Sequence, residues 1–226
     1  MLTRRSLTTL AFYTLLSISV VLLLPIDSKA SQNTQIKILV LGDSLTAGYG
    51  LDKSDSFPAV LEKHLLASGW NVSVANGGVS GDTSAGGKNR LQWALTKKPD
   101  VVIIELGAND GLRGLNPNNT KENLAAILRE LQQRKILVLL TGMLAPPNLG
   151  KTYGREFKKI YVDLASKFNL PLYEFFLDGV AGKPALNQSD GIHPNKKGVN
   201  VIVQRILPNV ISVLKNLSKK YPRDKN

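Results

Sequence analysis

The stretch IKILVLGDSLTAGYG, residues 36 to 50, indicates the fold class of this chain of 226 residues. Its first six residues are aliphatic apart from Lys37, and they lead directly into a turn that contains Gly42, Gly48 and Gly50. A short, almost continuous aliphatic run is typical of a strand in a parallel sheet that helices cover on both faces. The stretch therefore predicts a buried strand whose carboxyl end opens into a glycine-rich loop.

The same alternation of short apolar runs and amphipathic stretches continues along the chain. We expect strands at residues 36–41, 72–75, 101–106, 136–141 and 170–173, and helices at residues 58–68, 85–96, 120–134, 153–167 and 195–215. Strands that alternate with helices in this way form βαβ units with right-handed crossovers. The pattern predicts one α/β domain, a three-layer α/β/α sandwich with about five parallel strands.

The composition removes several kinds of chemistry. There is no cysteine, which excludes disulfides, thiolate metal sites and a cysteine nucleophile. His64 and His193 are the two histidines, too few for a histidine-rich metal site, so we expect no metal and no cofactor. The formal net charge is +12, and the remaining composition is that of a globular protein.

The first thirty residues have the pattern of an export signal. Arg4 and Arg5 precede an uncharged run at residues 6–25, and a small-residue cleavage pattern ends at Ala30. We expect cleavage there, leaving a single domain at 31–226 with a charge of about +10 and a basic C-terminal tail. The expected location is the periplasm or the outside of the cell. Retention of the apolar run as a membrane anchor is the alternative.

The loops after the predicted strands hold the candidates for chemistry, because parallel strands end at one edge of the sheet. Ser44 directly follows the first strand in a glycine-bounded turn. His193 precedes Pro194, which favours an extended backbone, and Asp190 lies three residues before the histidine. A serine nucleophile needs a base within hydrogen-bond reach and a group that orients the base. His64 falls within a predicted helix and is interpreted as a surface or boundary residue of that helix.

Two further loops offer hydrogen-bond donors. Asn109 supplies a side-chain amide after the third strand, and Gly81 lets its backbone N–H approach a ligand without a Cβ in the way. Asp43 and Asp110 are interpreted as residues that anchor turns. Ordinary turn chemistry accounts for each residue taken alone, whereas together the loops supply the parts of one acyl-transfer mechanism.

Four segments in these loops carry a resemblance to a known family. They are GDSL at residues 42–45, SGDT at 80–83, GAND at 107–110 and DGIHP at 190–194. With these motifs the chain resembles the SGNH (GDSL-type) hydrolases over nearly all of residues 36–214, and most closely the bacterial periplasmic branch of acyl-CoA thioesterases, lysophospholipases and arylesterases. The resemblance implies a flavodoxin-like fold.

The resemblance also implies roles for individual residues. It implies that Ser44 is the nucleophile, His193 the base and Asp190 the residue that orients the base. It implies an oxyanion hole made by the backbone amides of Ser44 and Gly81 and the side chain of Asn109. In the loops on the substrate side, we expect Leu112, Pro146 and Pro147 to bind substrate. Relatives commonly carry an aromatic residue near Leu149, so their acyl-chain preference does not transfer.

These observations predict a serine hydrolase that cleaves carboxylic esters or thioesters without a cofactor. The expected partners are a small acyl ester or thioester and the surface of an anionic membrane, with no nucleic acid, and we expect a monomer. The expected substrates are aryl esters, short to medium acyl esters, lysophospholipids and acyl-CoA. Two alternatives stay open: an exported carbohydrate O-deacetylase, and a non-catalytic binder of anionic lipid or polymer.

Overall fold

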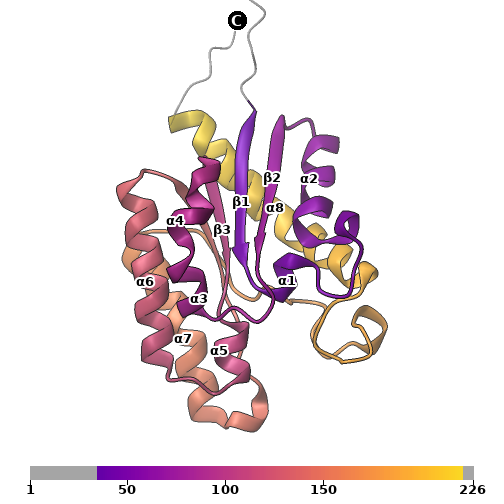
Figure 1. Cartoon of the computed structure of the whole chain (residues 1–226), viewed down its shortest axis with the longest axis vertical. Coiled ribbons are helices and arrows are strands. Elements are labelled where there is room, and N and C mark those ends of the chain that lie inside the picture. Colours follow the sequence, from indigo (N-terminus) through magenta and orange to yellow (C-terminus); the bar gives the residue numbers. More distant parts are fainter. Residues whose placement is uncertain (1–34, 221–226) are drawn as a thin grey trace, which may run out of the picture. The chain divides into compact units, whose positions relative to one another are not determined.

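A parallel sheet of five strands forms the centre of the domain in the computed structural model, which describes the chain from residue 35 to residue 220 and side chains as far as residue 217. The strand order is β2-β1-β3-β4-β5 (Figure 1). The strands are Ile36–Gly42 (β1), Val72–Gly78 (β2), Val101–Glu105 (β3), Leu137–Thr141 (β4) and Leu172–Tyr173 (β5). The predicted α/β fold is confirmed. The expected signal sequence and the last residues of the basic tail lie outside the described residues.

Helices cover both faces of the sheet. Figure 1 shows α2 and α8 on one side, where they pack on each other, and α3, α6 and α7 on the other. The helices are Ser44–Ala47 (α1), Phe57–Ala67 (α2), Ser84–Asn89 (α3), Leu91–Ala94 (α4), Ala108–Leu112 (α5), Pro117–Gln133 (α6), Lys151–Phe168 (α7) and Lys196–Lys220 (α8). Short 3₁₀ helices are Lys53–Asp55 (η1), Leu95–Lys97 (η2), Pro147–Leu149 (η3) and Pro184–Leu186 (η4).

The core lies between the sheet and these helices. Residues 101–104 of β3 are completely buried, as the central strand of a sheet covered on both faces must be. On α6, Leu124, Leu128 and Leu131 repeat at helical spacing and are also buried. Among the described residues, no helix is long and apolar enough to cross a membrane.

The structure differs from the sequence prediction where tertiary contacts override local patterns. The helix expected at 85–96 is broken at Arg90, whose backbone leaves helical geometry while its side chain bonds Asp82 and the carbonyl of Gly42. Strand β2 extends to Gly78 instead of ending at residue 75. Strand β5 is shorter than expected and begins after Pro171, which has no N–H to donate to a ladder. Short helices α1 and α5 occupy segments expected to be loops.

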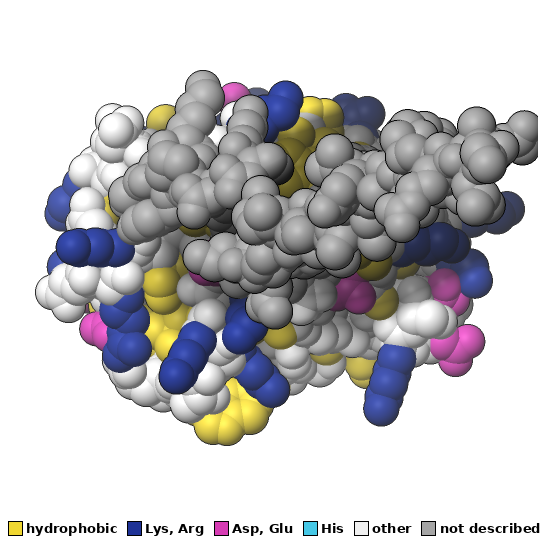
Figure 2. All heavy atoms as spheres, turned by 90° about the horizontal axis from the view of Figure 1, so that it is seen from above, with side chains coloured by type: hydrophobic (Ala, Val, Ile, Leu, Met, Phe, Trp, Pro, Cys, Tyr) yellow, Lys and Arg dark blue, Asp and Glu magenta, His cyan; other side chains and the backbone are white. Residues whose placement is uncertain are grey.

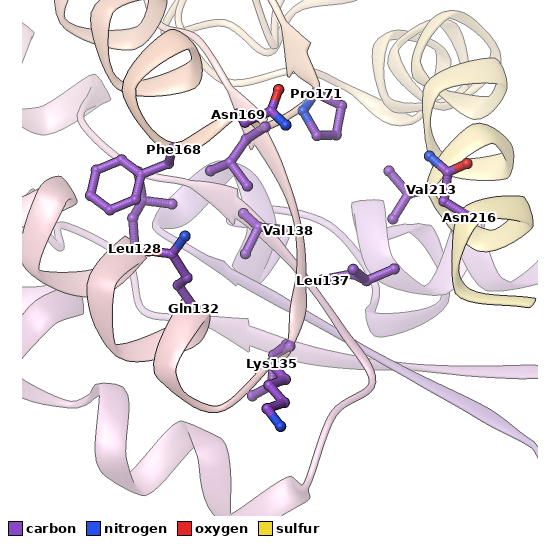
Figure 3. A pocket seen from close by; sticks show the side chains of 12 residues that line it. Leu128, Gln132, Lys135, Leu137, Val138, Phe168, Asn169, Pro171, Val213 and Asn216 are labelled. Carbon is purple, nitrogen blue, oxygen red and sulfur yellow. The ribbon is translucent and has the colours of Figure 1, made fainter. Parts of the chain in front are cut away.

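A groove of about 260 Å³ lies at the end of the sheet where the strands begin (Figure 3). It is bounded by α6, the start of β4 and α8, and Leu137, Val138 and Val213 contribute to its lining. Its polar lining residues are Gln132, Lys135, Asn169 and Asn216. This set contains no nucleophile with a neighbouring base, so the groove is not where acyl-transfer chemistry is to be sought.

We predict that Gly78→Ala will destabilise the fold and disturb α1. A Cβ at Gly78 would lie 2.3 Å from the backbone nitrogen of Ala47 and 2.8 Å from the carbonyl oxygen of Asp43. Overpacking of this kind costs roughly 1–3 kcal/mol in the free energy of unfolding. Urea unfolding measures the change.

Gly154→Ala is the matched control for this substitution. Gly154 lies within α7, and a Cβ there would meet no atom within 4 Å. The control should gain about 0.5–1 kcal/mol, since alanine favours helix over glycine. Equal changes in the free energy of unfolding for the two substitutions would show that the contact between β2 and α1 is not as tight as described.

Candidate active site

Ser44 is presented directly after the carboxyl end of strand β1, which lies between β2 and β3. It is the first residue of α1, and Asp43 caps this short helix, with Oδ1 accepting a hydrogen bond from the Leu45 amide at 3.0 Å. Behind the turn, a Cβ at Gly42 would fall 2.0 Å from Oγ1 of Thr46 and 2.4 Å from Oε2 of Glu105. Glycine is therefore required at residue 42, and the turn packs directly against the buried side chains of Thr46 and Glu105.

The structure brings Ser44 together with His193 and Asp190. The Oγ of Ser44 lies 2.9 Å from Nε2 of His193, and Nδ1 of the same ring lies 2.7 Å from Oδ2 of Asp190. Since a carboxylate accepts, Nδ1 carries the hydrogen and Nε2 is left to accept the serine hydroxyl hydrogen. This is the arrangement in which an imidazole can take a proton from a serine.

Asp190 is held by its own loop as well as by the histidine. Its Oδ1 accepts the backbone N–H groups of Ile192 and His193, each at 3.0 Å. The His193 backbone bond, followed by the bond from the His193 ring and the Ile192 amide, lowers the pKa of Asp190 to about 2. The carboxylate thus stays ionised at neutral pH, as a group that orients and stabilises an imidazolium must.

Two backbone amides near Ser44 have no acceptor among the described residues. They are the N–H groups of Ser44 and Gly81. Gly81 has a φ of +84°, in the left-handed region that favours glycine, and its carbonyl accepts a bond of 3.0 Å from Nη2 of Arg113. Unpaired N–H groups in a site are available for an anionic oxygen.

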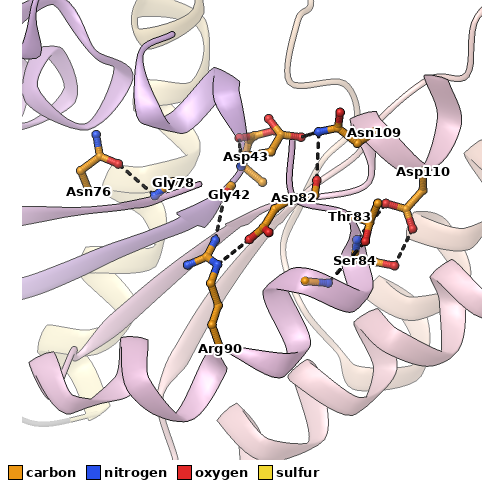
Figure 4. A network of polar contacts seen from close by, with 12 residues as sticks. Gly42, Asp43, Asn76, Gly78, Asp82, Thr83, Ser84, Arg90, Asn109 and Asp110 are labelled. Carbon is orange, nitrogen blue, oxygen red and sulfur yellow. Dashed lines mark hydrogen bonds and ion pairs between the residues drawn. The ribbon is translucent and has the colours of Figure 1, made fainter. Parts of the chain in front are cut away.

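The side-chain amide of Asn109, in contrast, is already engaged. Nδ2 donates to the carbonyl of Asp82 at 2.9 Å and to Oδ2 of Asp43 at 3.2 Å (Figure 4). Both amide hydrogens have an acceptor, the second at a longer distance. Asn109 can therefore reach a ligand only by sharing or exchanging its contact with Asp43.

Buried and half-buried polar residues connect the loops of the site to one another (Figure 4). Arg90 joins Asp82 to the carbonyl of Gly42, and so connects the loop after β2 to the end of β1. Asp110 accepts bonds from the hydroxyl and the amide of Ser84, at 2.6 and 2.8 Å, and so connects the loops after β3 and β2. The interpretation of Asp43 and Asp110 as turn anchors agrees with these bonds.

Glu105 is a buried acid of β3 for which the sequence predicted no role beyond the strand. Its Oε2 accepts from Oγ1 of Thr46 at 2.6 Å and from the amide of Asp43 at 3.3 Å, while Oε1 is buried without a partner. Burial raises the pKa of Glu105 well above its usual range, and Asp43 adds to the rise. Burial also raises the pKa of Asp43, to about 6. A charged residue at the end of an aliphatic run was the signal available in the sequence.

A cavity of about 410 Å³ opens beside Ser44 and His193. Its exposed lining is mainly apolar, and it includes all three residues expected on the substrate side: Leu112, Pro146 and Pro147. Other lining residues were not predicted from the sequence, among them Met143, Leu144, Phe175, Leu177 and Ile192. Gly81 is not part of this lining, and His64 lies on α2 away from it. Within residues 35–217, no cluster of acidic and histidine side chains could hold a metal ion.

Known proteins are similar to this chain in sequence and in fold. Residues 40–201 match the GDSL-like Lipase/Acylhydrolase family. An arylesterase of Vibrio mimicus is 40% identical over 188 residues, which cover 83% of this chain and 94% of the relative. A thioesterase 1/protease 1/lysophospholipase L1 of Escherichia coli K12 is 42% identical over 160 residues, covering 70% of this chain and 76% of the relative.

A solved structure supports the same comparison. The crystal structure of TesA has a TM-score of 0.75 and 40% sequence identity, and the match covers 78% of this chain and 99% of that one. The similarity thus extends through the domain that carries Ser44, Asp190 and His193.

We predict that Glu105→Gln will flatten the dependence of stability on pH. A carboxyl group with a raised pKa binds its proton more tightly in the folded state than in the unfolded state. The contribution of this proton to the free energy of unfolding is therefore complete below the pKa of the unfolded state, about 4.3. It is lost as the pH rises through the pKa of the folded state. Urea unfolding at pH 5, 7 and 9 should show a shallower decline for the glutamine variant than for the wild type.

Glu122→Gln is the control, because Glu122 is exposed on α6. This variant should keep the wild-type dependence on pH. If Glu105→Gln also keeps it, the carboxyl of Glu105 does not titrate as its burial indicates.

Proposed function

Because the chain belongs to the GDSL-like lipase/acylhydrolase family, and is thus an ester-cleaving serine hydrolase, we propose that Ser44 is its nucleophile, His193 the base and Asp190 the residue that orients the base. The observation that carries the assignment is the continuous contact from Ser44 Oγ through the imidazole to Asp190, at 2.9 and 2.7 Å. As an enzyme, the chain is not the non-catalytic binder that the sequence left open.

The reaction proceeds in two acyl-transfer steps. Nε2 of His193 takes the hydroxyl proton while Oγ of Ser44 attacks the carbonyl carbon, and the imidazolium then protonates the leaving alcohol or thiol. Water attacks the resulting acyl-enzyme, again losing a proton to His193, and the released Ser44 oxygen takes that proton back. The products are a carboxylic acid and the alcohol or thiol, and Asp190 remains ionised throughout.

Three donors stabilise the oxyanion of each tetrahedral intermediate. The unpaired amides of Ser44 and Gly81 support their role as the first two. Asn109 becomes the third when its amide exchanges the 3.2 Å contact with Asp43 for the oxyanion, while the bond to the Asp82 carbonyl holds it in place.

The cavity beside Ser44 supports an apolar acyl group. Leu112, Pro146 and Pro147 contact this group, and the mainly apolar lining favours the acyl chains of aryl esters, short to medium acyl esters, lysophospholipids and acyl-CoA. Carbohydrate O-deacetylation is the alternative. Its substrate would leave most of the apolar lining without a partner.

After export from the cytoplasm, the domain also meets an anionic membrane surface through the end of the sheet where the strands begin. Seen from that end, Lys and Arg side chains outnumber acidic ones among the described residues in view (Figure 2). Six exposed lysines of this end form no ion pair within residues 35–217: Lys37, Lys97, Lys98, Lys135, Lys167 and Lys215. Helix C-termini at the same end offset part of this charge.

Ser44→Ala should abolish both hydrolysis of p-nitrophenyl butyrate and labelling by a fluorophosphonate probe. Loss of a serine nucleophile lowers turnover by at least about 10³-fold, because the acyl-enzyme can no longer form. Ser166→Ala, at an exposed position of α7, is the control and should label and turn over like the wild type.

Labelling that persists in Ser44→Ala would assign the nucleophile elsewhere. With the wild type, a series of p-nitrophenyl esters, acyl-CoAs and lysophospholipids beside acetylated xylan distinguishes the substrate classes. Faster release of acetate from xylan than hydrolysis of the other substrates would favour the deacetylase.

Neutralising Lys97, Lys98 and Lys135 to glutamine should weaken binding to phosphatidylglycerol vesicles on the order of 100-fold, at about 1 kcal/mol per lysine. Sedimentation of the chain from residue 31 with vesicles measures this change, and phosphatidylcholine vesicles should bind neither protein. The same substitutions at Lys53, Lys151 and Lys183 are the matched control. If both triple variants bind equally, net charge alone and not this surface attracts the membrane.

A further inference from the structure

The two partners of the proton transfer come from distant parts of the chain. Ser44 and His193 are separated by 149 residues, and the loop that carries the base is exposed at Asp190, Gly191 and Ile192. An exposed loop does not keep a side-chain contact of 2.9 Å through core packing. Some other interaction must hold it beside α1.

A second set of hydrogen bonds connects the backbone carbonyls of the same two residues by way of Tyr49 and Gln188. The Tyr49 N–H donates to the Ser44 carbonyl at 3.1 Å. The side-chain Nε2 of Gln188 donates to the Tyr49 carbonyl at 2.7 Å, and the backbone N–H of Gln188 donates to the His193 carbonyl at 2.8 Å. We call this path, from Ser44 through Tyr49 and Gln188 to His193, the Gln188 bracket.

The environment of Gln188 fits this role closely. Its second amide hydrogen goes to the Pro194 carbonyl at 3.0 Å, so both hydrogens of the side chain are used. Gly50 has a φ of +73°, and a Cβ there would lie 2.1 Å from Oε1 of Gln188. Glycine at residue 50 therefore leaves the space in which the side-chain amide lies.

The residue that Gln188 holds also touches the base directly. The ring of Tyr49 lies 4.7 Å from the imidazole ring of His193, centroid to centroid, at an interplanar angle of 36°. Because the Tyr49 carbonyl is bonded to Gln188, release of that carbonyl would move a ring that packs on His193. The bracket thus affects the position of the imidazole through two contacts: the backbone bond from Gln188 to His193 and the packing of the Tyr49 ring on the imidazole.

We propose that Gln188 is a positioning residue, which keeps the loop of Asp190 and His193 docked on the segment of Ser44 so that the base stays within reach of the nucleophile. The inference rests on the proposed function and adds a residue to it. Gln188 touches neither substrate nor the reacting atoms. It acts through the placement of His193, and a displacement of about 1 Å at such a group can cost about 10²-fold in rate.

Gln188→Ala should lower kcat for p-nitrophenyl butyrate by about 10- to 100-fold and leave KM within about twofold, since the acyl cavity is unchanged. The rate of fluorophosphonate labelling should fall by the same factor, because it depends on the same activation of Ser44. Gln188→Glu keeps the size but replaces Nε2, which donates both hydrogen bonds, with an oxygen that faces the carbonyls of Tyr49 and Pro194. The kcat of Gln188→Glu should fall by at least as large a factor as that of Gln188→Ala. This second variant tests the inference if the alanine variant does not fold.

Lys196→Gln is the matched control. The ion pair of Lys196 with Asp55, at 3.0 Å, also connects the region after the base loop to the segment after α1, but on the exposed surface. Such pairs contribute little, so this variant should stay within about twofold of the wild-type kcat.

A double-mutant cycle separates positioning from a merely structural role. Tyr49→Ala and Gln188→Ala act on the same imidazole, so their combined loss in kcat should be well below the product of the single losses. Losses that multiply, or wild-type kcat and labelling rate in both Gln188 variants, would overturn the inference. Those results leave the proposed function intact if Ser44→Ala is inactive, whereas an active Ser44→Ala overturns the proposed function itself.

Discussion

The architecture of the site depends on one close approach in the sheet. Gly42 of β1 lies in register with Glu105 of β3, and the space that a side chain at residue 42 would fill is taken by the Glu105 carboxyl and the Thr46 hydroxyl. The turn that carries Ser44 is thereby hydrogen-bonded to Glu105, an acid that is completely buried. Burial raises the pKa of Glu105 and favours its neutral form, which avoids a second buried charge beside Asp43.

The nucleophile and the base are held by different physical means. Ser44 belongs to a turn supported from inside by buried groups. Arg90 connects the loop after β2 to the end of β1, and Asp110 connects the loop after β3 to the loop after β2. His193 belongs to an exposed loop whose position depends on hydrogen bonds, within the loop through Asp190 and across the chain through Gln188. Loops on a rigid sheet are common carriers of function, and this one needs specific polar contacts because it has little core of its own.

The two ends of the sheet have different surfaces. At the carboxyl ends of the strands, a mainly apolar cavity lies beside Ser44, with unpaired amides of Ser44 and Gly81 nearby. At the opposite end lies a second groove, whose lining includes Lys135, and the exposed lysines of that end form no ion pair within residues 35–217. A domain that met a membrane through its basic end would keep the cavity open to substrate on the other side.

The sequence by itself determined the fold class and the candidate residues of the site: aliphatic runs predicted the parallel sheet, and the loops after them identified Ser44, Gly81, Asn109, Asp190 and His193 as candidates. It could do so because hydrophobic periodicity and turn composition are local properties of a chain. Only the tertiary structure decided the break at Arg90, the extension of β2 to Gly78, the burial of Glu105 and the contact between Gln188 and Tyr49. Each of these depends on which atoms from distant segments share one small space, and no local pattern carries that information.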